Sequence, residues 1–351
     1  MTRTSSTASE AEIAVWALTP NGAALASKIA AGVPKADVYV AQKLGGLAKA
    51  CRFESLAQAV AGCFHRYTGH VFIMATGIVV RTVAPLMLHK TQDPAVVVVD
   101  DRGQFAISLL AGHLGGANKL AEQVAAAIGA TPVITTATDV NAVPAIDVLA
   151  GEAGMAIENP QAIKTVNMAL LTGAAVEVHD PFGLLSNRIP NARAVGPGGP
   201  LVPRVLVDDR LLDAPPGALI LRPPSLVAGI GCNRRTAADE IRGLLLATLR
   251  EAGLSRASLR GLASIDLKAD EPGLVALAQE LGLPIEFFGR QEINRVGGAV
   301  QTPSAMVEKH IGVKSVCEAT AILATRGGEL VVPKRTTRNA TVAIARVNFT
   351  S

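Results

Sequence analysis

A glycine-rich loop with one histidine is the first candidate for chemistry in this sequence. Residues 111–116 are AGHLGG, and they precede a helix expected over Ala117–Ile128. The first turn of a helix carries unpaired backbone N–H groups and partial positive charge, which suits a carboxylate or phosphate. Glycine lets the backbone approach such a ligand closely. The loop predicts an anion-binding crevice that holds His113, and a plain tight turn with a satisfied histidine is an equal alternative.

Two titratable side chains of this region could move protons. Histidine ordinarily has a pKa near neutrality, so His113 is a candidate general base. Asp139 ends the next apolar run and could orient a water or the histidine, with an Asx turn as the alternative. Backbone N–H groups after Gly115 and Gly116 are candidate donors to an oxyanion. This chemistry would be hydrolytic, and no Gly-x-Ser-x-Gly element indicates a serine nucleophile.

Three further residues near this loop are expected to bind substrate. Gly77 follows the apolar run 71–75, which predicts a buried strand, and Arg81 lies in the short helical piece after it. Asn118 stands at the start of the expected helix. Ligands of α/β sheets bind at such strand-end loops, so we expect these residues to border one crevice.

A second group of charged residues lies in the C-terminal third. Arg234 and Arg235 follow the apolar run 226–230, and guanidinium groups bind carboxylates bidentately. Lys268 could hold a substrate carboxylate and Glu271 could take a proton. The alternatives are a solvated basic turn for the arginines and a helix cap, worth about 1 kcal/mol, for Glu271.

Two helix starts in this third also carry candidate caps. Thr236 with Asp239 fits a capping box for a helix that runs to about Glu251. Ser315 with Glu318 fits a second capping box, which is a sufficient structural explanation for Glu318.

A glycine pair in the same third raises a rival function. Gly229-x-Gly231 stands between an apolar run and a helix, as in a nucleotide-binding turn. However, Arg234 occupies the place of the third glycine, and Asp266 follows far beyond the ~20 residues that this fingerprint expects. A nucleotide-dependent oxidoreductase is therefore the weaker reading.

Composition limits the classes of protein that the chain can be. Of 351 residues, 49% are apolar, 18% charged and 3% aromatic, which favours α/β layers with aliphatic cores. The 33 basic and 29 acidic residues form no long block, and few aromatics are present to stack bases, so nucleic acid is not an expected partner. The four cysteines have no metal-ligand spacing. No run is typical of a signal peptide or membrane span, which predicts a soluble, cytoplasmic protein.

The order of elements predicts a chain of three α/β parts. Residues 1–139 are expected to form a Rossmann-like sheet domain, which opens with strand, helix and strand, and in which 104–110 returns as a strand after the turn at 100–103. Residues 140–224 are expected to form a small middle module and linker, with proline and glycine gathered at 196–200 and 215–224. Residues 225–351 are expected to form a separate α/β domain that ends in a β-pair.

Long stretches of the chain resemble the cobalt-precorrin-5A hydrolase family of anaerobic cobalamin biosynthesis. The resemblance is carried in the core, 69–139, by TGIVVRTVAPL, KTQDPAVVVVDDRGQFAISLLAGHLGGANKLA and ATPVITTATD, in this order. It resumes in the C-terminal part with LVAGIGCNRRT, LASIDLKADEPGL, GVKSVCEATAIL and VVPKRTT. Two separate blocks that agree make a chance match a poor explanation.

The resemblance implies a reaction and its participants. The enzyme would open the lactone of a ring-contracted cobalt corrinoid and release acetaldehyde to give cobalt-precorrin-5B. Cobalt would arrive within the substrate, so no cofactor and no protein metal site are expected. The expected partners are the polycarboxylate corrinoid itself and, as candidates, neighbouring pathway enzymes; the oligomeric state stays open. A non-catalytic carrier of corrinoid intermediates is the main alternative. We expect loops from both ends of the chain to contact so large a ring.

Overall fold

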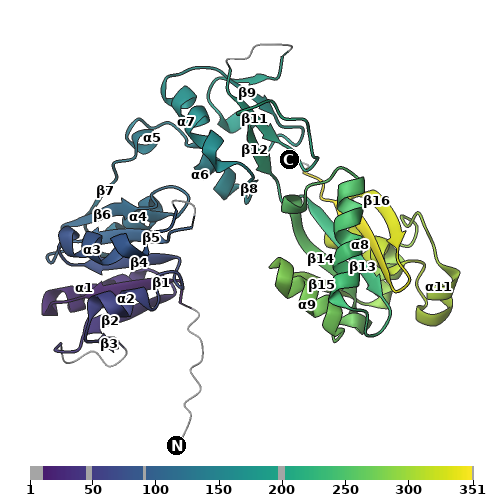
Figure 1. Ribbon diagram of the computed structural model, residues 1–351, viewed down its shortest axis with the longest axis horizontal. Coiled ribbons are helices and arrows are strands. Elements are labelled where there is room, and N and C mark those ends of the chain that lie inside the picture. The colour runs from purple at the N-terminus through teal and green to yellow at the C-terminus, as the bar shows by residue number, and fades with distance from the viewer. Residues whose placement is uncertain (1–10, 45–49, 90–91, 197–201, 350–351) are drawn as a thin grey trace, which may run out of the picture. The chain divides into compact units, whose positions relative to one another are not determined.

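The computed structural model in Figure 1 describes residues 11–44, 50–89, 92–196 and 202–349. The chain divides into two compact units, Met1–Val148 and Leu149–Ser351. Within the described ranges the first unit holds one sheet and the second holds two, all covered by helices. These three sheet layers confirm the predicted α/β class with a middle module. No helix among the described residues is long and apolar enough to cross a membrane.

The first unit is built on a sheet with the strand order β3-β2-β1-β4-β5-β6-β7. The central strands β4 (GHVFI) and β5 (AVVVV) are wholly buried, because helices cover the sheet on both faces. The strands are β1 (Ile13–Ala17), β2 (Ala36–Ala41), β3 (Cys51–Phe53), β4 (Gly69–Ile73), β5 (Ala95–Val99), β6 (Phe105–Leu110) and β7 (Thr131–Val133).

Four of the described helices pack on the two faces of this sheet, and α6 runs from the end of the first unit into the second. One core joins α1 and α4 to the sheet, and a second core, on the face that carries Trp16 and Phe72, takes in α2 and α3. Gly116 and Gly129 flank α4 with left-handed φ angles of 83° and 75°, which suits glycine. The helices are α1 (Pro20–Gly32), α2 (Leu56–Ala61), α3 (Thr76–Val83), α4 (Ala117–Ile128), α5 (Ala137–Val140) and α6 (Ile146–Glu152), with a 3₁₀ turn at Ala84–Leu86.

The direction of β6 decides where the loops of the first unit lie. β1, β2, β4 and β5 are parallel, whereas β6 pairs antiparallel with β5, as the turn at 100–103 predicts. β7 in turn runs parallel to β6. The loops after β6 and β7 therefore leave the sheet at the edge where β4 and β5 begin. The loop after β4, which contains Gly77, leaves at the opposite edge.

The middle part of the chain forms a small sheet within the second unit. Its strand order is β10-β9-β11-β12-β8, and α7 (Ile163–Leu171) follows the expected start at Asn159-Pro160 after one 3₁₀ turn, Pro160–Ala162. Apart from Gly196, the glycine-rich run expected at 196–200 lies outside the described residues. The strands are β8 (Ala156–Ile157), β9 (Val176–His179), β10 (Ala192–Ala194), β11 (Arg204–Val207) and β12 (Leu219–Arg222), and a 3₁₀ turn lies at Ser186–Arg188.

The C-terminal part forms a sheet with the order β15-β14-β13-β17-β16. α8 and α9 share one core with it, and α12 packs on its other face (Figure 1). The strands are β13 (Leu226–Cys232), β14 (Leu259–Ile265), β15 (Ile285–Phe288), β16 (Glu329–Thr336) and β17 (Ala340–Arg346). The helices are α8 (Ala238–Glu251), α9 (Pro272–Leu281), α10 (Arg290–Arg295), α11 (Ala305–Ile311) and α12 (Val316–Ala324), with 3₁₀ turns at Arg256–Ser258 and Asp266–Lys268.

Both capping boxes predicted in this part are wrong. The N-cap of α8 is Ala237, and the Thr236 hydroxyl donates to the carbonyls of Asn233 and Asn339 instead. Ser315 is the N-cap of α12 but makes no side-chain cap bond. Glu318, fully buried, turns away from the helix start and accepts three backbone N–H bonds from Gln301, Thr302 and Lys334. Both side chains are buried, and each has distant partners: Asn339 for Thr236, and Gln301, Thr302 and Lys334 for Glu318.

A buried ion pair joins the middle and C-terminal sheets within the second unit. Asp209 is fully buried and accepts two bonds from the Arg346 guanidinium, at 2.7 and 2.9 Å, and one from the Ser225 hydroxyl at 2.7 Å. Arg346 also lies 5.9 Å from the ring of Phe182. The region around residue 225 is therefore a packed junction between the two sheets.

Candidate functional site

His113 is held between two aspartates in the first unit. Its Nε2 lies 2.9 Å from Asp139 Oδ2, and its Nδ1 lies 3.3 Å from Asp147 Oδ2. Asp147 is only 6% exposed, whereas Asp139 is 40% exposed. The three residues come from the loop after β6, from α5 and from α6. The geometry confirms contact between His113 and Asp139, and it adds Asp147.

A chain of hydrogen bonds fixes this triad to the sheet. Asn118, buried at the start of α4, donates to Thr136 Oγ1 at 2.7 Å and to Asp139 Oδ2 at 3.1 Å. Its own Oδ1 accepts from the Ser108 hydroxyl on β6 at 2.7 Å. Thr138 Oγ1 lies 3.0 Å from His113 Nε2. Asn118, predicted to bind substrate, is thus engaged in orienting Asp139.

The two carboxylates change the protonation expected for His113. The hydrogen bond to Asp147, opposed by burial and reinforced by Asp139, raises the pKa of His113 to about 8. An imidazolium flanked by two carboxylates is favoured at neutral pH because each charge stabilises the other. The raised pKa favours the protonated form of His113 near neutral pH, in which it donates to Asp139. The general-base role of His113 stays a prediction.

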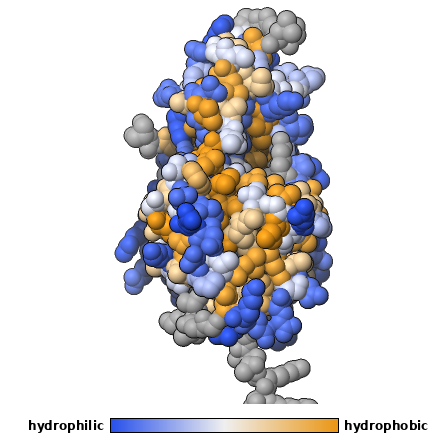
Figure 2. Space-filling view, turned by 90° about the vertical axis from the view of Figure 1, so that its left-hand side faces the viewer, coloured by the Kyte–Doolittle hydropathy of each residue, from blue (hydrophilic) through white to orange (hydrophobic). Residues whose placement is uncertain are grey.

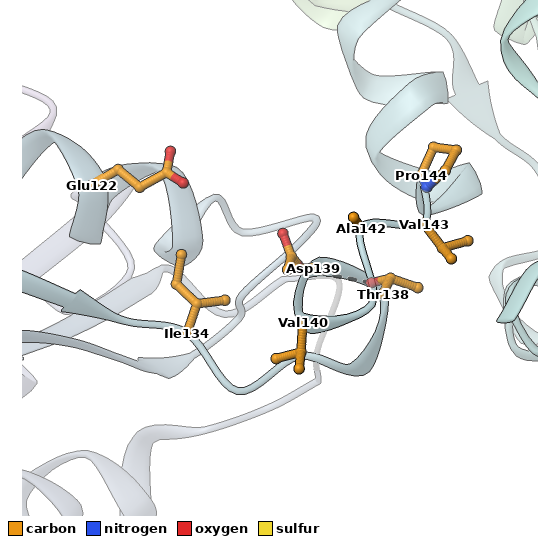
Figure 3. A pocket seen from close by; sticks show the side chains of 8 residues that line it. All are labelled: Glu122, Ile134, Thr138, Asp139, Val140, Ala142, Val143 and Pro144. Carbon is orange, nitrogen blue, oxygen red and sulfur yellow. Dashed lines mark hydrogen bonds between the residues drawn. The ribbon is translucent and has the colours of Figure 1, made fainter.

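A cavity of about 540 Å³ opens beside this triad (Figure 3). Asp139 and Thr138 border it from one side, and Glu122 of α4 faces them across the opening. Ile134, Val140, Ala142, Val143 and Pro144 complete the lining. The volume falls within the ~300–1,000 Å³ typical of ligand sites. A wall with apolar side chains and two exposed carboxylates suits an apolar ligand surface that presents a water or hydroxyl to Asp139.

The glycine loop forms the turn without offering the predicted donors. The N–H groups of Gly116, Ala117 and Asn118 donate to the carbonyls of His113, Ala111 and Gly112, respectively. A Cβ on Gly115 would lie 2.3 Å from that of Ala111, so the turn itself requires glycine there. The backbone groups expected to bind an oxyanion are used within the loop. That part of the prediction is wrong, and the plain-turn alternative explains the glycines.

Gly77 and Arg81 do not join this group. Gly77 lies at the opposite edge of the sheet from His113, and Arg81 is exposed in the last turn of α3. The single crevice expected for all of these residues is therefore wrong. α3 instead exposes apolar side chains, with Ile78 and Val80 40% and 46% accessible. Apolar side chains also gather between hydrophilic ones on the face shown in Figure 2.

In the second unit, Glu271 faces inward. It is 1% exposed, accepts the backbone N–H of Arg235, and lies 3.5 Å from Lys268 Nζ. Arg235 has a left-handed φ of 61°, a strained conformation for a residue with a side chain. Arg234 is exposed and pairs with Asp270 at 3.4 Å. Glu271 thus holds a turn, which does not fit the predicted proton transfer, while Lys268 faces a cavity described below.

Gly229 has a packing role rather than a nucleotide-binding one. It lies inside buried β13, where a Cβ would stand 1.8 Å from the Cys317 carbonyl of α12. A phosphate-binding glycine stands in a loop before a helix. The Gly229-x-Gly231 pattern therefore does not support a nucleotide-dependent oxidoreductase.

Two residues of the site, Asp147 and Glu122, have no distinctive sequence pattern. Asp147 precedes an apolar helical stretch and has the pattern of an ordinary acidic residue in a first turn. Glu122 lies within an amphipathic helix, where a glutamate is expected on the exposed face.

Among the described residues, no group of three or more His, Cys, Asp or Glu side chains is arranged to hold a metal ion.

Known families and proteins match this chain along most of its length. "Cobalamin synthesis G N-terminal" matches residues 58–139, "Cobalamin biosynthesis central region" 144–223, and "Cobalamin synthesis G C-terminus" 226–345. A solved structure, that of CobE, a protein from the cobalamin biosynthetic pathway, also matches. Its sequence is 44% identical to this chain, and the match covers 35% of this chain and 92% of CobE with a TM-score of 0.34.

Two curated relatives extend over nearly all of the chain. The cobalt-precorrin-5A hydrolase of Priestia megaterium is 32% identical over 366 residues, which cover 96% of each protein. That of Salmonella typhimurium is 37% identical over 335 residues, 90% of this chain and 92% of the relative. The family expected from the sequence motifs is confirmed: the chain belongs to the cobalt-precorrin-5A hydrolase family.

Proposed function

We propose that this chain hydrolyses cobalt-precorrin-5A, opening its lactone and releasing acetaldehyde to give cobalt-precorrin-5B. The observation that carries the proposal is the similarity to two cobalt-precorrin-5A hydrolases over 96% and 90% of the chain. Cobalt enters as part of the substrate, and we propose no added cofactor or protein metal.

The cavity beside His113 supports a division of labour in this reaction. We assign Asp139 as the base that takes a proton from the attacking water, because its carboxylate borders the cavity. The water oxygen then bonds to the lactone carbonyl carbon, and the lactone C–O bond breaks to leave an alkoxide. The alkoxide collapses to acetaldehyde as the adjoining C–C bond breaks, and the macrocycle takes that electron pair.

His113 and Asn118 are positioning residues in this scheme. Both donate towards Asp139 Oδ2 and fix the carboxylate at the mouth of the cavity. The imidazolium also offsets negative charge that builds up as the lactone opens. Lys268 in the second unit is proposed to bind a substrate carboxylate.

The first prediction is acetaldehyde release. The purified parent, given the lactone-bearing cobalt intermediate, is expected to release one acetaldehyde per macrocycle without NAD, ATP or added metal. Asp139→Asn should lower kcat about 10²–10⁴-fold with little change in KM, since it removes the base but leaves the cavity. Glu152→Gln, an exposed residue of α6, is the matched control.

Two results would contradict the proposal. Parent protein that binds the intermediate tightly but releases no acetaldehyde would favour the carrier alternative. Asp139→Asn turnover equal to that of the parent would remove Asp139 from the mechanism while leaving the activity in place.

A further inference from the structure

A second cavity lies at the strand ends of the C-terminal sheet. Its volume is about 290 Å³, and it opens where the parallel strands β13 and β14 end. Ligands of α/β sheets bind outside the carboxyl ends of parallel strands. The lining side chains that matter here are Cys232, Lys268, Lys334 and Arg338.

The charged side chains that line this cavity are all positive. Lys268, Lys334 and Arg338 line it, and no Asp or Glu is among the described residues of its wall. The nearby acidic side chains do not line the cavity and accept backbone hydrogen bonds instead. Glu318 accepts three backbone N–H groups, and Glu271 accepts the backbone N–H of Arg235. Lys334 Nζ donates one bond, to the Thr302 carbonyl at 2.8 Å, and an ammonium has three donors. The cavity is therefore built to attract an anion.

The two lysines and the turn that carries Arg338 are held in place before any ligand arrives. Glu240 of α8 accepts bonds from the Thr337 hydroxyl at 2.6 Å and from the Asn339 backbone at 3.2 Å, which anchors the turn that carries Arg338. Lys268 is 12% exposed and rests against buried Glu271. Lys334 is anchored through its backbone N–H to Glu318 at 2.9 Å. Such preorganisation lowers the entropy cost of binding.

We propose that this cavity binds a carboxylate side arm of the tetrapyrrole substrate. This inference rests on the proposed function and assigns Lys334 and Arg338, beside Lys268, as substrate-binding residues. The volume lies just below the ~300–1,000 Å³ of pockets that enclose drug-sized ligands, so it suits a side arm rather than a whole macrocycle. Guanidinium and ammonium groups are the usual partners of carboxylates.

The first test separates binding from turnover. Lys334→Gln and Arg338→Gln should each raise KM about tenfold or more and leave kcat within about twofold, since a hydrogen bond to a charged group is worth about 1.5–3 kcal/mol. Lys334→Arg keeps the charge and should retain most of the affinity. Arg242→Gln, an exposed arginine on α8 that pairs with Glu280, is the control. Unchanged KM in both Gln variants, with parent-like thermal unfolding, would overturn the inference.

The second test uses Cys232 as a reporter that does not depend on turnover. Cys232 lines the cavity and is partly exposed, whereas Cys51, in the first unit, is exposed and serves as internal control. Iodoacetamide labelling of each cysteine is followed by mass spectrometry in the full chain. Cobyrinic acid, a corrin with free carboxylate arms, should slow labelling of Cys232 several-fold and leave Cys51 unchanged. Cobinamide, whose arms are amides, should protect much less.

The two tests also distinguish the inference from the proposed function. Selective protection of Cys232 by cobyrinic acid, lost in Arg338→Gln, would support the cavity even if the parent released no acetaldehyde. Equal protection by both corrins, or none by either, in a parent that turns over its substrate would overturn the carboxylate site and leave the hydrolase proposal intact.

Discussion

At the scale of single residues, two histidines of the first unit show how neighbours set protonation. Burial lowers the pKa of His70 to about 4, and its ring accepts from Trp16 Nε1 at 3.1 Å. Asp147 and Asp139 instead raise the pKa of His113 to about 8. His70 is fully buried without a carboxylate partner among its causes, so burial disfavours its charged form, whereas the carboxylates beside His113 favour the cation and outweigh its partial burial.

The pH dependence of turnover is expected to follow His113. A raised pKa means that the imidazolium persists up to about pH 8 and is lost above it, so kcat should fall on the alkaline side. Asp147→Asn removes the largest cause of the shift, so the alkaline limb should move down by about one pH unit. The measurement is kcat between pH 6 and 9, with Glu152→Gln as control. An unmoved limb would separate His113 from the pH profile.

At the scale of elements, the contact between β13 and α12 shows how a glycine sets helix packing. The backbone of Gly229 lies so close to α12 that any Cβ would meet the Cys317 carbonyl. Thr320 in α12 also donates to the Ala263 carbonyl of β14 at 3.4 Å. The helix therefore sits directly over the strands whose ends form the cationic cavity.

Gly229→Ala should destabilise the protein. The added methyl group forces strand and helix apart, and such overpacking costs about 1–3 kcal/mol or more. Gly243→Ala is the matched control, because Gly243 lies in the interior of α8 with open space around its Cβ position and should gain up to about 1 kcal/mol. Urea unfolding measures both. A Gly229→Ala protein as stable as the parent would contradict the close approach.

At the scale of the whole molecule, the buried ion pair between Asp209 and Arg346 links two sheets of the second unit. It connects the end of β11 to β17, which are 137 residues apart in sequence. A buried pair adds little stability compared with apolar residues, but loss of one partner leaves an uncompensated charge. The pair thus specifies how the middle and C-terminal sheets pack together.

Removing one partner of this pair should cost far more than removing both. Arg346→Leu leaves the Asp209 carboxylate buried and unpaired, so the free energy of unfolding should fall by about 3–5 kcal/mol. Asp209→Leu combined with Arg346→Leu should recover part of that loss. Arg242→Leu, which breaks exposed pairs, should cost less than about 1 kcal/mol. If the double variant lost as much as Arg346→Leu and Asp209→Leu together, the two charges would not interact.

Local sequence patterns determined the order and type of most elements and the family. Gly129 ends α4 as expected, Pro272 begins α9, and the turn at 100–103 returns the chain as β6. Such signals depend on residues a few positions apart, so they can be recognised in the sequence without knowledge of the fold. The family motifs are equally local, because each is a continuous run of sequence.

Only the tertiary structure decided which candidate residues meet. The strand-end pattern is the same for Gly77 and His113, but the antiparallel pairing of β6 sends their loops to opposite edges of the sheet. Asp147 at the start of α6 contacts His113, which lies 34 residues earlier in the sequence. Buried Glu318 accepts three backbone N–H groups of other segments and takes no part in a helix cap. Strand direction and helix packing are set by burial of apolar surface between distant segments. The pKa of a titratable residue depends on such distant neighbours, so the local sequence pattern does not predict it.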